Sequence, residues 1–112
     1  MALEKLRPQS CVIRDTAARK GRNLTVTPGL TPTRHLHYGR IILDGGDADV
    51  TVDPDGRETG LICLKGSVTV SLGAKQFALT RYDALYIPRV TPFTVTPGPQ
   101  GCDIAEISAP VD

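Results

Sequence analysis

The sequence contains no tryptophan and few other aromatic residues. Its 112 residues include only three tyrosines and two phenylalanines. Proteins that hold single-stranded nucleic acid stack bases on aromatic side chains, so such a binding platform is not expected. Neither sign of charge dominates, because 13 basic residues balance 12 acidic ones and the net charge is +1. Since no basic stretch could follow a phosphate backbone, we expect no nucleic-acid partner.

Long apolar runs are absent as well. The charged N-terminal stretch MALEKLRPQSCVIRD lacks the apolar segment of about 7–15 residues that a signal peptide needs. Nothing in the sequence approaches the ~18 consecutive apolar residues of a membrane-spanning helix. The three cysteines, Cys11, Cys63 and Cys102, are odd in number and form no C-x-x-C pair, which argues against a disulfide framework or a zinc knuckle. We therefore expect a cytoplasmic protein with reduced thiols and no membrane partner.

Glycine and proline are abundant instead. The sequence has Gly 11 and Pro 9, and these residues separate short apolar stretches, which is typical of an all-β protein. In Ser67–Leu72 the even positions are apolar and the odd positions polar, as in a strand with one buried face. The length suits a single domain over residues 1–112, with residues 1–22 as an N-terminal arm or edge strand. We expect strands at 23–27, 35–43, 48–52, 61–65, 67–72, 76–79, 84–87, 93–96 and 102–108.

The segment Arg57–Val95, RETGLICLKGSVTVSLGAKQFALTRYDALYIPRVTPFTV, resembles the core of a cupin. More narrowly, DALYIPRVTPFTV and the later AEISAP are similar to the family of 5-deoxy-glucuronate isomerase and 5-keto-4-deoxyuronate isomerase. The likeness extends more loosely back to VTPGLTPTRHLHYGRIIL. It implies an all-β fold, the cupin double-stranded β-helix or jelly roll, closed into a small barrel. Proteins of that family carry tandem cupin barrels with the metal ligands in the second, and this sequence resembles the first, N-terminal barrel.

The usual cupin metal motif is missing from the positions where the resemblance implies it. Counted from Gly66 and Pro88, the implied ligand positions hold Asp53, Asp55, Thr59 and Phe93. A phenyl ring has no donor atom, and a hydroxyl group is a poor ligand for a divalent ion. We therefore expect no metal and no other cofactor. The run DPDG is instead typical of a turn, in which Pro54 fixes φ and Gly56 supplies a positive φ.

The two histidines lie one residue apart, as His35 and His37 in RHLHYGR. Strand residues two apart share a face, which is the geometry that two metal ligands need. Glu58 is the best spare carboxylate for a third ligand, but it follows the pair by far more residues than the cupin spacing allows. We interpret the histidines as polar residues near a strand end. A metal pair and a metal-free role in substrate binding or proton transfer remain open alternatives.

Two functions compete. The resemblance implies aldose–ketose isomerisation of a small sugar acid, here without the usual metal site. That reaction needs a base and an electrophile, for which the catalytic candidates are His35, His37 and Glu58. The candidate substrate-binding residues are Arg57, Tyr86, Arg89 and Phe93.

The alternative is a non-catalytic, metal-free cupin with a ligand-binding or structural role, so whether the chain is an enzyme stays open. The expected partners are a small-molecule ligand of the sugar-acid class and a second copy of the chain. We expect a homodimer because a small barrel with open edge strands tends to cover them by pairing.

Overall fold

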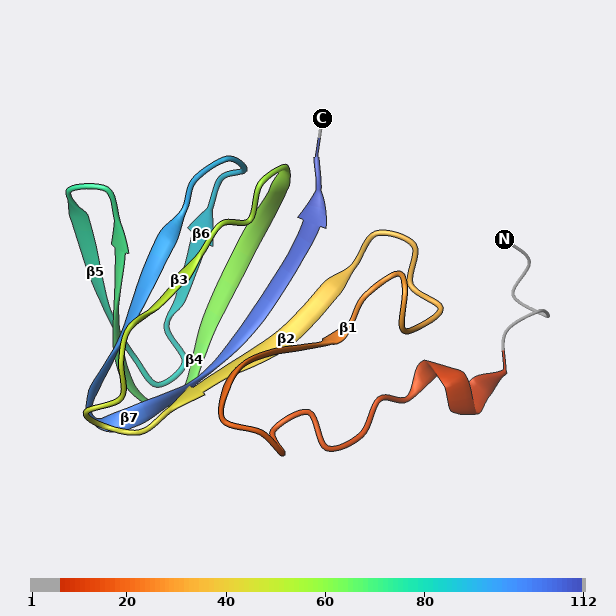
Figure 1. The fold of residues 1–112 in the computed structure, drawn as a ribbon, viewed down its shortest axis with the longest axis horizontal. Helices are drawn as coiled ribbons and strands as arrows, with labels where there is room; N and C mark the ends of the chain where they lie inside the picture. Colours follow the sequence, from red (N-terminus) through yellow and green to blue (C-terminus); the bar gives the residue numbers. More distant parts are fainter. Residues whose placement is uncertain (1–6, 112) are drawn as a thin grey trace.

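The computed structural model describes residues 7–111, and almost all of its regular structure is β-sheet (Figure 1). After a short 3-10 turn at Pro8–Cys11, the strands are β1 (Gly21–Val26), β2 (His37–Leu43), β3 (Val50–Val52), β4 (Arg57–Leu72), β5 (Lys75–Thr80), β6 (Ala84–Ile87) and β7 (Phe93–Pro110). The predicted all-β class is confirmed. No helix within the described part of the chain is long and apolar enough to cross a membrane.

The long strands β4 and β7 run antiparallel beside each other and belong to both halves of the sheet. The first half of β4 and the second half of β7 pair with β6 and β2, and β1 adds an edge beyond β2. The other halves of the two long strands pair with β5 and β3. The sheet therefore folds over on itself, and Figure 1 shows the two halves diverging from the bend in β4 and β7.

Two glycines form the bend at which β4 and β7 pass from one half to the other. Gly66 and Gly101 have φ angles of 75° and 85°, a region that residues with a Cβ atom rarely adopt. A Cβ atom on Gly66 would lie 2.1 Å from the carbonyl oxygen of Gly101. The strand register also shifts on both sides of Gly66, as at a β-bulge. The prediction of separate strands here is wrong, because each pair of expected strands is one continuous, bulged strand.

The hydrophobic core lies between the two halves of the folded sheet. The alternation predicted for Ser67–Leu72 is confirmed, since Val68 and Val70 are buried. Phe93, a candidate substrate-binding residue, is 1% exposed and pairs with Val52 across the strands. The buried apolar side chains of the core also include Ile41, Leu43, Leu61, Cys63, Leu79, Ile87, Val95, Cys102 and Ile104.

The DPDG turn is present, but its backbone differs from the expected one. The amide of Arg57 donates to the carbonyl oxygen of Pro54 at 3.1 Å, which closes the turn. The positive φ predicted for Gly56 occurs at Asp55 instead, with φ 55°. Asp55 tolerates this conformation because its amide donates to the Asp53 Oδ1 atom at 3.0 Å, so the side chain before it stabilises the turn.

The N-terminal segment leads into an edge strand. Residues 12–20 have no regular structure, and β1 begins at Gly21 and pairs with β2 alone. The Arg40 Nη1 atom donates to Thr16 Oγ1 at 3.5 Å, which ties this segment to the sheet. Residues 1–6 of the expected arm lie outside the described residues. The homodimer stays a prediction, for which the free edge of β1 is one available surface.

Candidate functional site

Polar side chains occupy one end of the interior, where a core would ordinarily be apolar. Cross-strand pairing places His37 of β2, Ser108 of β7 and Thr59 of β4 in one row. Thr59 and Ser108 are 1% and 3% exposed. Because strand residues two apart share a face, Arg57 and Glu106 face the same interior as this row. Together with an arginine from β1, these residues form the polar cluster, defined as Arg22, His37, Arg57, Thr59, Glu106 and Ser108.

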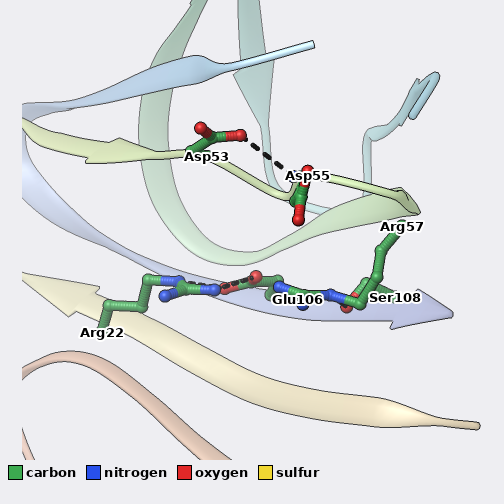
Figure 2. A network of polar contacts seen from close by, with 6 residues as sticks. All are labelled: Arg22, Asp53, Asp55, Arg57, Glu106 and Ser108. Atoms are coloured by element: carbon green, nitrogen blue, oxygen red, sulfur yellow. Dashed lines mark hydrogen bonds and ion pairs between the residues drawn. The ribbon is translucent and has the colours of Figure 1, made fainter. Parts of the chain in front are cut away.

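Arg22 and Glu106 form the buried ion pair of the cluster. The Arg22 Nε and Nη2 atoms donate to Glu106 Oε1 and Oε2 at 2.8 and 2.7 Å. The Glu106 side chain is 1% exposed and the Arg22 side chain 26%. Figure 2 shows the guanidinium of Arg22 facing the carboxylate of Glu106. This two-bond geometry is the strongest arrangement available to an arginine and a carboxylate, and it fixes both side chains.

Arg57 enters the cluster from the first residue of β4. Its Nε atom donates to Ser108 Oγ at 3.2 Å, and Figure 2 shows the Arg57 side chain lying over Ser108. The ion pairs formed within residues 7–111 leave Arg57 without a carboxylate partner. The interior face therefore holds two guanidinium groups and one carboxylate, and the cluster carries an excess of positive charge.

Thr59 has a buried hydroxyl group with no hydrogen-bond partner. Within the described part of the chain, its Oγ1 atom and that of Thr25 are the two buried side-chain oxygen or nitrogen atoms in this condition. Buried polar groups in folded proteins are nearly always hydrogen-bonded. On the other side from Ser108, Thr59 pairs with the fully buried Ile87 of β6, so one side of the hydroxyl is apolar.

The three catalytic candidates are not brought together. Glu58 lies between two residues that face the interior, so strand alternation directs it to the outer face. There a hydrogen bond with Glu58 raises the pKa of Tyr86, whose side chain is 63% exposed. His35 is exposed in the loop before β2, and its carbonyl oxygen lies 3.2 Å from His37 Nδ1. Of the three candidates, His37 alone belongs to the polar cluster.

The four substrate-binding candidates are separated as well. Arg57 belongs to the polar cluster, and Tyr86 lies on the outer face. Arg89 is exposed in the loop that follows β6. Phe93 is part of the apolar core, where it contributes bulk rather than a polar contact.

The sequence analysis did not single out Arg22, Glu106 or Ser108. One signal was available in the stretch AEIS. Residues two apart on a strand share a face, so Glu106 and Ser108 lie on the same face as the apolar Ile104, which is directed toward the core. A charged residue on an apolar strand face is rarely buried without a partner. That partner is Arg22, and the expected N-terminal arm gave no indication of it.

The residues at the implied cupin metal positions do not fit a metal ion. Asp53 and Asp55 are exposed on the turn, and Asp53 already accepts the Asp55 amide. Thr59 offers a hydroxyl group and Phe93 no donor atom. Among residues 7–111, no three His, Cys, Asp or Glu side chains gather in a way that could hold a metal ion. We derive no chemical step through a metal for this site.

Comparisons with known proteins give a consistent fold. No family model matches the sequence, and no curated protein matches it either. Among solved structures, an IolB-like protein from Salmonella typhimurium LT2 is 21% identical with a TM-score of 0.72 over 84% of this chain and 39% of the other. KdgF from Halomonas sp. is 15% identical with a TM-score of 0.65 over 81% and 80%.

The cupin domain of Cnp3 from Schizosaccharomyces pombe is 13% identical, with a TM-score of 0.66 over 80% of this chain. The present chain covers 60% of the Cnp3 chain and 39% of the IolB-like protein. At these identities the likeness concerns the fold alone. The bent strands shared by two halves of a sheet, the interior core and these structural neighbours together show that the chain has the all-β, cupin-type jelly-roll fold.

Proposed function

We propose that this cupin domain binds a small sugar acid at the polar cluster. The observation that carries the proposal is the pair of interior guanidinium groups, of which Arg22 is paired with the buried Glu106 carboxylate and Arg57 contacts Ser108 without a carboxylate partner among residues 7–111. The remaining positive charge suits a ligand carboxylate, which forms short charge-assisted hydrogen bonds with arginine. Two aspartates, Asp53 and Asp55, lie nearby, but both are exposed on the turn and solvated.

The rest of the cluster suits the hydroxyl groups of a sugar. Both oxygens of Glu106 accept from Arg22, and each carboxylate oxygen keeps a further lone pair for a hydroxyl donor. The hydroxyl of Ser108 and the imidazole of His37 add groups that both donate and accept. A ligand with one carboxylate and several hydroxyls therefore matches the cluster better than a purely apolar acid does.

Isomerisation of the bound sugar acid is the second candidate function. It is supported by the resemblance to the uronate isomerases and by the place of His37, directly opposite Ser108. His37 would take the proton from the carbon beside the carbonyl group and return it to the carbonyl carbon, while the hydroxyl proton on the first carbon passes to the former carbonyl oxygen. The alternative from the sequence, a non-catalytic ligand-binding cupin, needs the same cluster without this step.

Binding is tested by isothermal titration calorimetry with D-glucuronate and with D-glucose, which differ at the carboxylate. We expect glucuronate to bind at least about tenfold more tightly, the equivalent of about 1.4 kcal/mol. Arg57→Gln should remove most of that preference. Arg89→Gln, which changes an exposed arginine outside the cluster, is the matched control and should bind as the unchanged protein does. Equal affinity for both sugars, or no binding of glucuronate, galacturonate or mannuronate, would contradict the proposal.

Isomerisation is tested by following the same uronates in D₂O by NMR spectroscopy. An active enzyme should produce ketose signals and exchange the proton on the carbon beside the carbonyl group for deuterium. His37→Gln should stop both, whereas His35→Gln should stop neither, because His35 is exposed in the preceding loop. Binding without exchange would favour the non-catalytic alternative.

A further inference from the structure

We propose that the Thr59 hydroxyl is a ligand-binding group that contacts the carboxylate of the sugar acid beside Arg57. This inference rests on the proposed function and deepens it by assigning the carboxylate end of the ligand to one place in the cluster. Its starting point is that Thr59 is 1% exposed and its Oγ1 atom has no partner among the described residues.

An unpartnered hydroxyl at this position destabilises the free protein. A hydroxyl group that is buried without a partner loses its hydrogen bonds with water and gains no others, which costs free energy. Valine has nearly the shape of threonine, favours strands equally and carries no polar atom. On packing alone, valine would therefore be the better residue between Ser108 and Ile87. The hydroxyl is accounted for if a ligand supplies its missing partner.

The neighbours of Thr59 indicate which ligand group that partner is. Thr59 pairs directly with Ser108 across β4 and β7, and Ser108 Oγ accepts a hydrogen bond from the Nε atom of Arg57. The Nη atoms of Arg57 have no hydrogen-bond acceptor among residues 7–111 and no ion-pair partner there. A carboxylate that accepts from these Nη groups would have its second oxygen available to the Thr59 hydroxyl, which would then act as the donor.

Entry of a ligand requires a segment next to the cluster to move, because Thr59 and Ser108 are both buried. The turn Asp53–Gly56 leads directly into Arg57, and its Pro54 is fully buried. Two backbone hydrogen bonds hold the turn, Val90 N to Asp55 O at 2.7 Å and Val111 N to Gly56 O at 3.1 Å. Val90 has a positive φ of 58°, which strains a β-branched residue, and strained residues are frequent in ligand clamps and switch regions.

The test compares Thr59→Val with Thr25→Val, since both substitutions remove a buried, unpartnered hydroxyl. Thr25 lies on β1 against the N-terminal segment, beside Asp15 and Thr16 rather than in the polar cluster. Both variants should raise the melting temperature, by roughly 4 °C each. Thr59→Val should weaken glucuronate binding about tenfold or more, because it removes a hydrogen bond to a charged group. Thr25→Val should leave the affinity unchanged, and Thr59→Ser should retain most of it.

The outcomes separate this inference from the function on which it rests. If the unchanged protein binds glucuronate and Thr59→Val binds it equally well, the hydroxyl is not a ligand contact and only this inference falls. If Thr59→Val loses affinity and Thr59→Ser does too, the loss comes from packing and the inference is again overturned. If the unchanged protein binds none of the three uronates, the proposed function and this inference fall together. Higher stability with lower affinity in Thr59→Val, and that result alone, supports it.

Discussion

Arg22 and Glu106 lie 84 positions apart in the chain, and two parallel hydrogen bonds join them inside the barrel. The contact links the edge strand β1 to the last strand β7 across β2, because Arg22 pairs with Ile41 and Ile41 with Ile104. A buried carboxylate without a cation would be strongly unfavourable. The pair therefore fixes β1 on the sheet as well as shaping the polar cluster.

We predict that Arg22→Met destabilises the protein by about 3 kcal/mol, because it leaves the buried Glu106 carboxylate without its partner. The double variant Arg22→Met with Glu106→Leu should recover most of the loss, since no unpaired charge remains. Urea unfolding followed by circular dichroism measures both. Arg19→Met, at an exposed position, is the control and should change the free energy of unfolding by less than about 0.5 kcal/mol. An equal loss in the single and double variants would contradict this account.

Glu58 should influence Tyr86 and not the polar cluster. The nearby Glu58 carboxylate favours the neutral phenol and raises the pKa of Tyr86. Glu58→Gln should therefore lower that pKa toward its ordinary value, as measured by ultraviolet titration. Tyr86→Phe identifies which of the tyrosine titrations belongs to Tyr86. The affinity for glucuronate should stay unchanged in Glu58→Gln, and its loss would place Glu58 back among the site residues.

The three cysteines should differ sharply in reactivity. Cys11 is exposed, whereas Cys63 and Cys102 are buried. Burial raises the pKa of the Cys102 thiol to about 11 and raises that of Cys63 as well. At pH 8 about one Cys102 thiol in a thousand would then be a thiolate, the reactive form.

A disulfide-exchange reagent such as DTNB should therefore modify a single thiol quickly in the folded protein at pH 8. Cys11→Ser should remove this fast phase, and unfolding in urea should expose the other two thiols. The reaction of Cys102 should speed up about tenfold per pH unit and level off only above its raised pKa, because it follows the thiolate fraction. Rapid modification of two or three thiols in the folded protein at pH 8 would show that the core opens far more easily than its burial indicates.

Val90 should gain stability from replacement by glycine. Its φ of 58° lies in the left-handed region, where a β-branched side chain costs about 1–2 kcal/mol, and the residue is 64% exposed. Val90→Gly relieves this strain and loses part of the gain through the greater freedom of the unfolded chain. We expect a melting temperature higher by roughly 2–4 °C.

Val12→Gly provides the matched control for this substitution. Val12 is also exposed, at 51%, but its φ of −105° is ordinary for valine. Its replacement should therefore leave the melting temperature unchanged or lower it. A loss of stability in Val90→Gly would mean that the Val90 side chain contributes contacts that outweigh its backbone strain.

Local pattern predicted where most strands and the DPDG turn lie, but not which strands are continuous. Alternation in Ser67–Leu72 predicted which side chains are buried, because successive residues of a strand point to opposite faces. The same rule could have assigned Glu58 to the face opposite Thr59. The DPDG run predicted a turn correctly, but whether Asp55 or Gly56 takes the positive φ depended on the Asp53 side chain and on Val90 from another loop.

By itself, the sequence determined an all-β chain with a buried and a solvated face on strands such as Ser67–Leu72, and its resemblance to cupins indicated the fold. Only the tertiary structure decided that the predicted strands merge through bends at Gly66 and Gly101, that Glu106 is paired with Arg22, and that the Thr59 hydroxyl has no partner. The reason is that side-chain alternation is a property of one strand. The partner of a buried polar group depends on which strands become neighbours and in which register, and that choice involves residues far apart in the chain.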